Sequence, residues 1–137
     1  MPTQQKKIKV LLSKLGLDIH NRGVLTVAKN LRDAGMEVIY IGNSTPTQII
    51  KAALEEDADV IGVSSLGGAH IKLGRDLIAQ AQKEGIKDDK IFVMGGALSE
   101  EDIIKLKEMG FDDIFTSGAT KEEIVNSIGN LVDSKLG

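Results

Sequence analysis

Short apolar runs alternate with longer amphipathic segments along the chain. The runs, which are rich in Ile, Leu and Val, predict strands at 8–12, 37–41, 59–63, 90–94 and 113–115. The segments that follow them predict helices at 24–34, 46–56 and 69–83, then one from a cap at Ser99 to Gly110 and one from Lys121 onward. Strict alternation of this kind predicts an α/β fold in which helices cover both faces of a parallel sheet. For a chain of this length we expect a flavodoxin-like, doubly wound sheet of five strands in the order 2-1-3-4-5.

The length and composition of the chain fit one domain. We expect a single domain over 1–137, with a core at about 8–133 and short tails at 1–6 and after Asp133. Hydrophobic residues make up 42% and charged residues 27% of the chain, which is typical of a globular protein. No apolar run approaches the length of a membrane span, and the first residues lack a signal-peptide pattern. We therefore expect a cytoplasmic protein that does not bind a membrane.

Charge and composition argue against several classes of function. A net charge of -3 gives no concentrated basic surface for nucleic acid, and an aromatic content of 3% gives few rings for base stacking. The absence of cysteine excludes disulfides, thiolate metal sites and a cysteine nucleophile. The sequence has neither G-x-G-x-x-G after the first strand nor a Walker motif, so nothing supports a dinucleotide or nucleoside triphosphate site.

The predicted strand order brings three loops together at a binding site. In open α/β sheets, ligands bind beyond the carboxyl ends of the strands at the topological switch point, which lies here between the first and third strands. The loops expected there are 13–23, 64–68 and 95–98. The second reads SSLGG and the third opens with GG. Glycines in such places either form tight turns or let a large ligand lie against the backbone.

The first of these loops carries a candidate metal ligand, His20. Its sequence, SKLGLDIHNRG, is long for a strand-to-helix connection. Asp18 and His20 point the same way if the chain is extended. A carboxylate that accepts one imidazole N–H leaves the other ring nitrogen free to bind a metal ion or to take a proton. An isolated pair of this kind is more often solvated, so the pair alone assigns no chemistry.

The three loops together are more specific than any one of them. The pattern D-x-H-x-x-G at 18–23, S-x-L at 64–66 and G-G at 95–96 resembles the signature of the cobalamin-binding domain family. That family includes the acyl-CoA mutases, glutamate mutase and methionine synthase. The likeness extends from about Ile8 to Ile128, which is nearly the whole chain.

The resemblance implies roles for three residues near the cobalt of the cofactor. His20 would displace the benzimidazole of the cofactor and bind the cobalt in its place. Asp18 would accept a hydrogen bond from His20, and Lys14 would complete this relay. A neutral imidazole is a good ligand for cobalt, and a carboxylate partner raises its donor strength.

The other matching residues would hold the displaced nucleotide tail of the cofactor. The resemblance implies that Ser64 hydrogen-bonds the benzimidazole and that Leu66 lines the same region. Gly95 and Gly96 would make room for the tail, and Gly23 would let the helix begin beside it.

Within the family, the chain looks most like the acyl-CoA mutase branch. It departs from that branch at Ile19, where glycine is usual, and at 117–120, where SGAT replaces a Pro-Gly-Thr pattern. The implied cofactor is adenosylcobalamin, and the implied activity is that of an isomerase. Because the sequence shows no barrel domain to hold a substrate, we expect a small subunit, inactive alone, that works with a large barrel subunit. The acyl-CoA substrate would bind to that partner, which would also determine which acyl group is rearranged.

Four other functions are considered on the same residues. The small subunit of glutamate mutase looks similar but less so. A corrinoid carrier for methyl transfer usually has a helical module before this domain, and the sequence shows none. A phosphoacceptor signalling domain needs acidic residues after the first and third strands, where this chain has Ser13 and Ser64. A flavin carrier is disfavoured by the scarcity of aromatic residues.

A few further polar residues lie near the expected site. We interpret His70 as a polar residue at a helix start, although it could contact the cofactor or a partner. Asn21 and Arg22 could contact corrin amides or the partner. The acidic pair at 88–89 is interpreted as a solvated turn, and the three acidic residues at 100–102 as a helix N-terminus, because Asp and Glu favour that end of the helix dipole.

Overall fold

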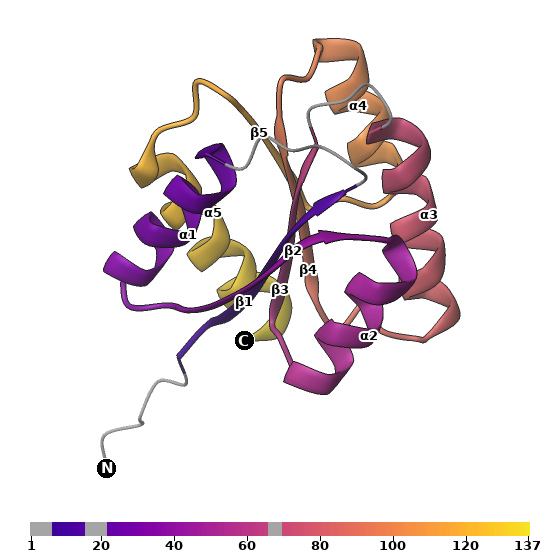
Figure 1. The fold of residues 1–137 in the computed structure, drawn as a ribbon, viewed down its shortest axis with the longest axis horizontal. Coiled ribbons are helices and arrows are strands. Elements are labelled where there is room, and N and C mark those ends of the chain that lie inside the picture. Colours follow the sequence, from indigo (N-terminus) through magenta and orange to yellow (C-terminus); the bar gives the residue numbers. More distant parts are fainter. Residues whose placement is uncertain (1–6, 16–21, 66–69) are drawn as a thin grey trace.

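The computed structural model describes residues 7–15, 22–65 and 70–137, and within these ranges it contains a five-stranded parallel sheet (Figure 1). The strands are β1 (Lys9–Leu15), β2 (Glu37–Ser44), β3 (Val60–Ser65), β4 (Ile91–Gly96) and β5 (Asp113–Thr116). Their order, β2-β1-β3-β4-β5, confirms the predicted flavodoxin-like topology. The helices are α1 (Arg22–Asp33), α2 (Pro46–Glu56), α3 (His70–Lys83), α4 (Glu100–Met109) and α5 (Lys121–Leu131), which a π-helical turn η1 (Val132–Leu136) follows. None of these described helices is long and apolar enough to cross a membrane.

The helices cover the sheet on both faces, as the alternating pattern predicts. α1 and α5 lie on one face, and α2, α3 and α4 lie on the other (Figure 1). Successive side chains of a strand point to opposite faces. Leu11 and Phe92 therefore join the core beneath α2, α3 and α4, whereas Val10 and Val93 join the core beneath α1 and α5. Burial on both faces explains why the strands are nearly continuous apolar runs.

Three of the helix starts that the sequence predicts are confirmed by their caps. Thr45 and Thr120 each accept a hydrogen bond from the backbone N–H three residues later, and the side chains there, Gln48 and Glu123, accept one in return. Ser99 caps α4 with its hydroxyl oxygen. Side-chain caps of this kind contribute about 1 kcal/mol each to helix stability. The local sequence therefore determines where α2, α4 and α5 begin.

The strands extend further toward the expected site than the sequence predicts. Residues 13–15, 64–65 and 95–96, which we expected in loops, are the last residues of β1, β3 and β4. The polar residues and glycines at these positions suggested loops, but neighbouring strands supply hydrogen-bond partners for their polar groups. The hydroxyl of Ser13, for example, donates a hydrogen bond to the carbonyl oxygen of Gly42 in β2 at 2.8 Å. The predicted loop boundaries were therefore wrong, and several candidate site residues are held in the sheet itself.

A β-bulge interrupts the regular pairing of β1 with β2 next to these residues. Leu12 pairs with Tyr40 and Lys14 pairs with Asn43, so two residues along β1 correspond to three residues along β2. The extra residue of β2 is accommodated at Gly42, whose φ of +72° is one that glycine adopts readily. Bulges commonly redirect side chains beside functional sites. This bulge sets Asn43 directly beside Lys14.

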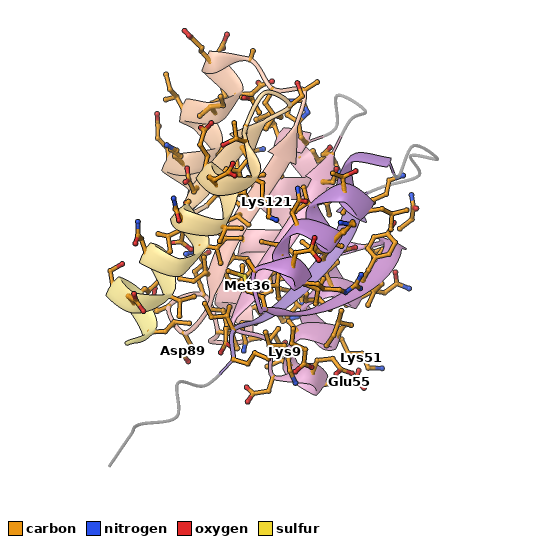
Figure 2. All side chains as sticks on the ribbon, turned by 90° about the vertical axis from the view of Figure 1, so that its left-hand side faces the viewer. Lys9, Met36, Lys51, Glu55, Asp89 and Lys121 are labelled. Atoms are coloured by element: carbon orange, nitrogen blue, oxygen red, sulfur yellow. The ribbon has the colours of Figure 1, made fainter. Side chains whose placement is uncertain are left out.

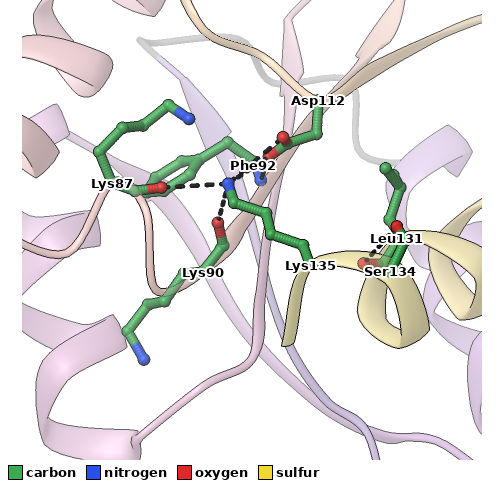
Figure 3. Close-up of polar contacts among 7 residues, drawn as sticks. All are labelled: Lys87, Lys90, Phe92, Asp112, Leu131, Ser134 and Lys135. Carbon is green, nitrogen blue, oxygen red and sulfur yellow. Dashed lines mark hydrogen bonds and ion pairs between the residues drawn. The ribbon is translucent and has the colours of Figure 1, made fainter. Parts of the chain in front are cut away.

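The residues after Asp133 do not form the tail that the sequence predicts. They continue α5 as the turn η1, and the side chain of Lys135 reaches across to the connection before β4 (Figure 3). Its Nζ atom lies 2.8 Å from the carbonyl oxygen of Lys90 and 3.2 Å from that of Lys87. An ammonium group can donate three hydrogen bonds, so it can satisfy several acceptors at once. Lys135 thereby fixes the end of the chain to the body of the domain.

We expect Lys135→Met to destabilise the protein by about 1.5 kcal/mol, because the substitution keeps the aliphatic stem and removes a partly buried charged donor. Lys135 also pairs with Asp112, whose carboxylate accepts a hydrogen bond from the backbone N–H of Phe92 (Figure 3). Urea unfolding followed by circular dichroism measures the change. Lys72→Met is the control, because its ion pair with Asp76 is exposed and worth less than about 0.5 kcal/mol. Equal losses in the two variants would contradict this role.

Candidate functional site

Three of the sequence-predicted site residues lie in one row across the sheet. Lys14 of β1 pairs with Ser64 of β3, and Ser64 pairs with Gly95 of β4. Asn43 and Phe115 continue this row to the two edge strands. Because side chains alternate along a strand, the positions of Lys14, Ser64 and Gly95 face α1 and α5. The sheet therefore brings these residues together at the carboxyl ends of its strands.

A cleft of about 440 Å³ opens over Ser64, Gly95 and Phe115 of this row, between the sheet and the helices α1 and α5. Its volume lies within the range of small-molecule and cofactor sites. The buried part of its lining is apolar and comes from five elements, namely Leu12, Val24, Leu31, Val63, Val93 and Ile128. Such a lining favours a flat or aliphatic group, because it offers no charge and few hydrogen bonds.

Polar groups line other parts of the same cleft. Thr26 and Asn30 come from α1, Lys121 comes from the first turn of α5, and Ser64 comes from the sheet. Figure 2 looks onto this face, with α1 in purple and α5 in yellow in front of the sheet and Lys121 labelled between them. The cleft thus combines an apolar interior with a polar, cationic entrance. This arrangement suits a ligand that is apolar at one end and hydrophilic or anionic at the other.

Gly95 is the reason that the cleft is open at this row. A Cβ atom built on Gly95 would meet only the carbonyl oxygen of Phe115, at an ordinary 3.5 Å. Two rows earlier, on the same face of the sheet, the space is already filled, because a Cβ on Gly62 would lie 2.7 Å from Cδ2 of Leu12. Gly23, at the start of α1, has no atom within 4 Å of such a Cβ. Gly95 and Gly23 therefore leave space that an ordered side chain would occupy.

Gly96 also lines the cleft, but its local conformation gives it a second role. Its φ is +152°, and a Cβ there would overlap the backbone carbonyl of Ser65. Ser65 is the residue of β3 that pairs with Gly96. The absence of a side chain thus allows the close approach of β3 and β4 at their carboxyl ends. The sequence assigned the same role to both glycines, whereas the structure gives Gly96 an additional role in the backbone.

Lys14 is a charged residue within the sheet and is only 1% exposed. Burying an ammonium group is costly unless an acceptor or an opposite charge compensates it. Asp18 follows four residues later in the sequence. The relay with Asp18 that the resemblance implies stays a prediction, because Asp18 lies outside the described residues.

Three predicted site residues, Asp18, His20 and Leu66, lie outside the described residues, and their roles stay predictions. Asp18 and His20 belong to 16–21, which connects the end of β1 to the start of α1. Leu66 belongs to 66–69, which connects β3 to α3. Both connections begin at the carboxyl ends of the strands that carry Lys14 and Ser64.

The sequence analysis missed the contribution of the helices to the cleft. Thr26 and Asn30 are four residues apart, so they lie on the same face of α1. Polar residues at that spacing, next to the buried positions Val24 and Ala28, were a signal that this face borders a partly polar space. Lys121 carried no such signal, because lysine is common in the exposed first turn of a helix.

His70 begins α3 as predicted, but it is not an ordinary exposed residue at a helix start. It is 8% exposed, and its Nε2 atom lies 2.6 Å from Oδ2 of Asp102 in α4. The interpretation of Asp102 as only a solvated helix N-terminus was therefore incomplete. Sequence patterns report neighbours along the chain, and this pair joins residues 32 positions apart.

Comparison with known proteins agrees with this geometry. The family described as B12 binding domain matches residues 8–125. The small subunit of 2-hydroxyisobutanoyl-CoA mutase from Aquincola tertiaricarbonis is 38% identical over 132 residues, which cover 96% of each chain. The small subunit of pivalyl-CoA mutase from Xanthobacter autotrophicus is 40% identical over 124 residues, 90% of this chain and 82% of that one. A crystal structure of a cobalamin-binding protein from Desulfitobacterium hafniense superposes with a TM-score of 0.78 at 21% identity, over 91% of this chain and 59% of that chain, which shows the shared fold.

Proposed function

This chain belongs to the B12-binding domain family, and we propose that it is the cobalamin-binding small subunit of an acyl-CoA mutase. The observation that carries the proposal is the cleft lined by Ser64 and Gly95, in the row that Lys14 continues, at the place where the family signature predicts the cofactor. Similarity to two small subunits of CoA mutases, each over most of its length, favours this branch over glutamate mutase. It likewise favours a mutase over a corrinoid carrier.

The residues of the cleft fit the nucleotide tail of cobalamin. The apolar interior suits the benzimidazole ring, and the gap at Gly95 gives the ring access to the sheet. The hydroxyl of Ser64 lines the same space and can hydrogen-bond a ring nitrogen. Lys121 and Asn30 suit the hydrophilic ribose and phosphate part of the tail. Gly23 and Leu66 complete the proposed binding surface.

The connection between β1 and α1 carries the proposed cobalt ligand. His20 would bind the cobalt through one ring nitrogen, and Asp18 would accept a hydrogen bond from the other. Lys14, which is buried at the end of β1, would complete this relay through Asp18. In this arrangement the cofactor would be held with its benzimidazole off the metal and a histidine on it.

Adenosylcobalamin, when bound, supplies the radical chemistry for rearranging a carbon skeleton. The residues of this chain bind and orient the cofactor, and we assign no substrate contact to them. The acyl-CoA would bind to a separate barrel subunit that covers the other side of the cofactor. That division of labour leaves substrate specificity to the partner and makes this chain inactive alone.

The proposal predicts that a histidine ligates the cobalt of the bound cofactor and that His20→Ala abolishes this ligation. The whole chain is loaded with adenosylcobalamin, with and without the large subunit, and absorbance spectra report loss of the benzimidazole ligand. Electron paramagnetic resonance of the cob(II)alamin form reports the new ligand. A protein with ¹⁵N-labelled histidine should change the superhyperfine pattern from a triplet to a doublet, because the ligand nucleus changes its spin.

Asp88→Asn serves as the matched control, because Asp88 lies in a turn after α3 and outside the cleft. It should keep the labelled-histidine pattern of the wild type. A spectrum with the benzimidazole on cobalt, or an unchanged pattern in His20→Ala, would contradict the ligand assignment. Mutase turnover by this chain without a partner would contradict the small-subunit assignment.

A further inference from the structure

His70, which is nearly buried, and Asp102, which is partly exposed, form a polar pair on the side of the sheet opposite the cleft. His70 is the first residue of α3, and its Nε2 atom lies 2.6 Å from Oδ2 of Asp102 in the first turn of α4. The hydrogen bond from His70 is the main cause that keeps the pKa of Asp102 below its usual value. Asp102 is therefore a carboxylate, and the N–H of His70 Nε2 donates to it.

The other ring nitrogen of His70 helps to fix the form of the ring. Nδ1 is buried, and within the described ranges no group lies in hydrogen-bond distance of it. A proton on Nδ1 would be a buried donor without an acceptor, which is more costly than an unused lone pair. Of the two neutral tautomers, the surroundings therefore favour the one that carries its proton on Nε2.

Close packing of the two helices brings the pair together. Gly74 lies one turn after His70, so both face the same side of α3. A Cβ atom on Gly74 would lie 3.0 Å from a methyl carbon of Leu106 in α4 and 3.2 Å from the terminal methyl of Met94 in β4. The missing side chain thus lets α3 lie close to α4, within reach of Asp102.

The pair joins α3 and α4, the helices that follow the site strands β3 and β4. Residues 66–69 alone separate Ser65, at the end of β3, from His70, and residues 97–99 alone separate Gly96 from α4. Ser65 and Gly96 are themselves paired in the sheet. The connection 97–99 therefore lies between a strand end that pairs with β3 and a helix that the histidine–aspartate hydrogen bond joins to α3.

We propose that His70 and Asp102 are positioning residues for the cofactor: by joining α3 to α4, they hold the connection 97–99 and the end of β4 in the arrangement that binds cobalamin. The inference rests on the proposed function, because Gly95 and Gly96, at the end of β4, line the proposed cofactor cleft. A directional hydrogen bond between charged and polar partners fixes geometry more narrowly than apolar contact does. An apolar pair at this place would stabilise the core alone, whereas a hydrogen-bonded pair also fixes the relative position of the two helix starts.

The test compares four variants of the full chain. His70→Phe keeps a buried ring and removes the hydrogen bond, and Asp102→Ala removes the acceptor. His70→Gln keeps an N–H donor that can reach the carboxylate. Asp76→Ala is the matched control, because it removes an exposed carboxylate from an ion pair on the same helix α3. Equilibrium dialysis with adenosylcobalamin, read by absorbance, gives the Kd of each, and urea unfolding shows that each is folded in the assay.

We expect His70→Phe and Asp102→Ala to raise the Kd for cobalamin about tenfold, with His70→Gln within about threefold of the wild type and Asp76→Ala unchanged. Histidine ¹⁵N shifts of the wild type should show that Nε2, and not Nδ1, carries the proton in the neutral form of His70. A folded His70→Phe or Asp102→Ala protein with wild-type affinity overturns the inference. So does a His70→Gln protein that binds as weakly as His70→Phe. A wild-type chain that binds no cobalamin overturns the proposed function itself, before any variant is compared.

Discussion

Gly95→Val is expected to lose about a hundredfold in affinity for cobalamin while the protein stays folded. Gly95 borders the cleft in the row with Lys14 and Ser64, and a Cβ there would meet only the carbonyl oxygen of Phe115 at 3.5 Å. Valine is well suited to a strand, so the free energy of unfolding should fall by less than about 1 kcal/mol. The added methyl groups would instead fill space that the nucleotide tail needs, and overpacking a site of that kind is strongly unfavourable.

Cobinamide separates this effect from a general loss of binding. It has the corrin ring and the cobalt but lacks the nucleotide tail, so its affinity should change by less than about twofold in Gly95→Val. Gly95→Ala should fall between the wild type and the valine variant for cobalamin, because its side chain fills less of the cleft. Parallel losses for cobalamin and cobinamide would show that Gly95 does not border the tail. Wild-type affinity for cobalamin in a folded Gly95→Val protein would remove the cleft from the site.

The fold could be predicted because its determinants are local. Short apolar runs such as 59–63 and cap residues such as Thr45 and Thr120 are determined by neighbours within one turn or one strand. The strand ends could not be predicted in the same way. Ser13 has a polar side chain that suggests a loop, and only the carbonyl oxygen of Gly42, 29 residues away, lets it belong to a strand.

The part of the candidate site that consists of short sequence motifs could be predicted. The row formed by Lys14, Ser64 and Gly95 follows from motifs that the topology brings to one edge of the sheet. The contribution of α1 and α5 to the cleft, and the pairing of His70 with Asp102, depend on contacts between distant segments. A single sequence shows the periodicity of hydrophobic positions in each segment, but it does not show which residues of different segments contact one another across the core.

Gly96→Ala is expected to destabilise the protein by about 3 kcal/mol, in contrast to its neighbour. Gly96 has a φ of +152°, which is unfavourable for a residue with a side chain, and the new methyl group would overlap the backbone carbonyl of Ser65. Backbone strain of this kind costs about 1–3 kcal/mol, and the displacement of paired strands adds to it. Unlike a flexible side chain, the carbonyl of Ser65 cannot move aside, because β3 and β4 are paired at this position.

Urea unfolding of Gly96→Ala and Gly95→Ala distinguishes the two glycines. Only the first substitution should lower the free energy of unfolding by more than about 1 kcal/mol. If Gly96→Ala is as stable as Gly95→Ala, the close approach of β3 and β4 does not require glycine, and the two residues share one role. If the expected difference is found, Gly96 maintains the strand ends from which the connections 66–69 and 97–99 begin. Its effect on the cofactor would then act through the positions of those strand ends, whereas that of Gly95 acts through the empty space beside it.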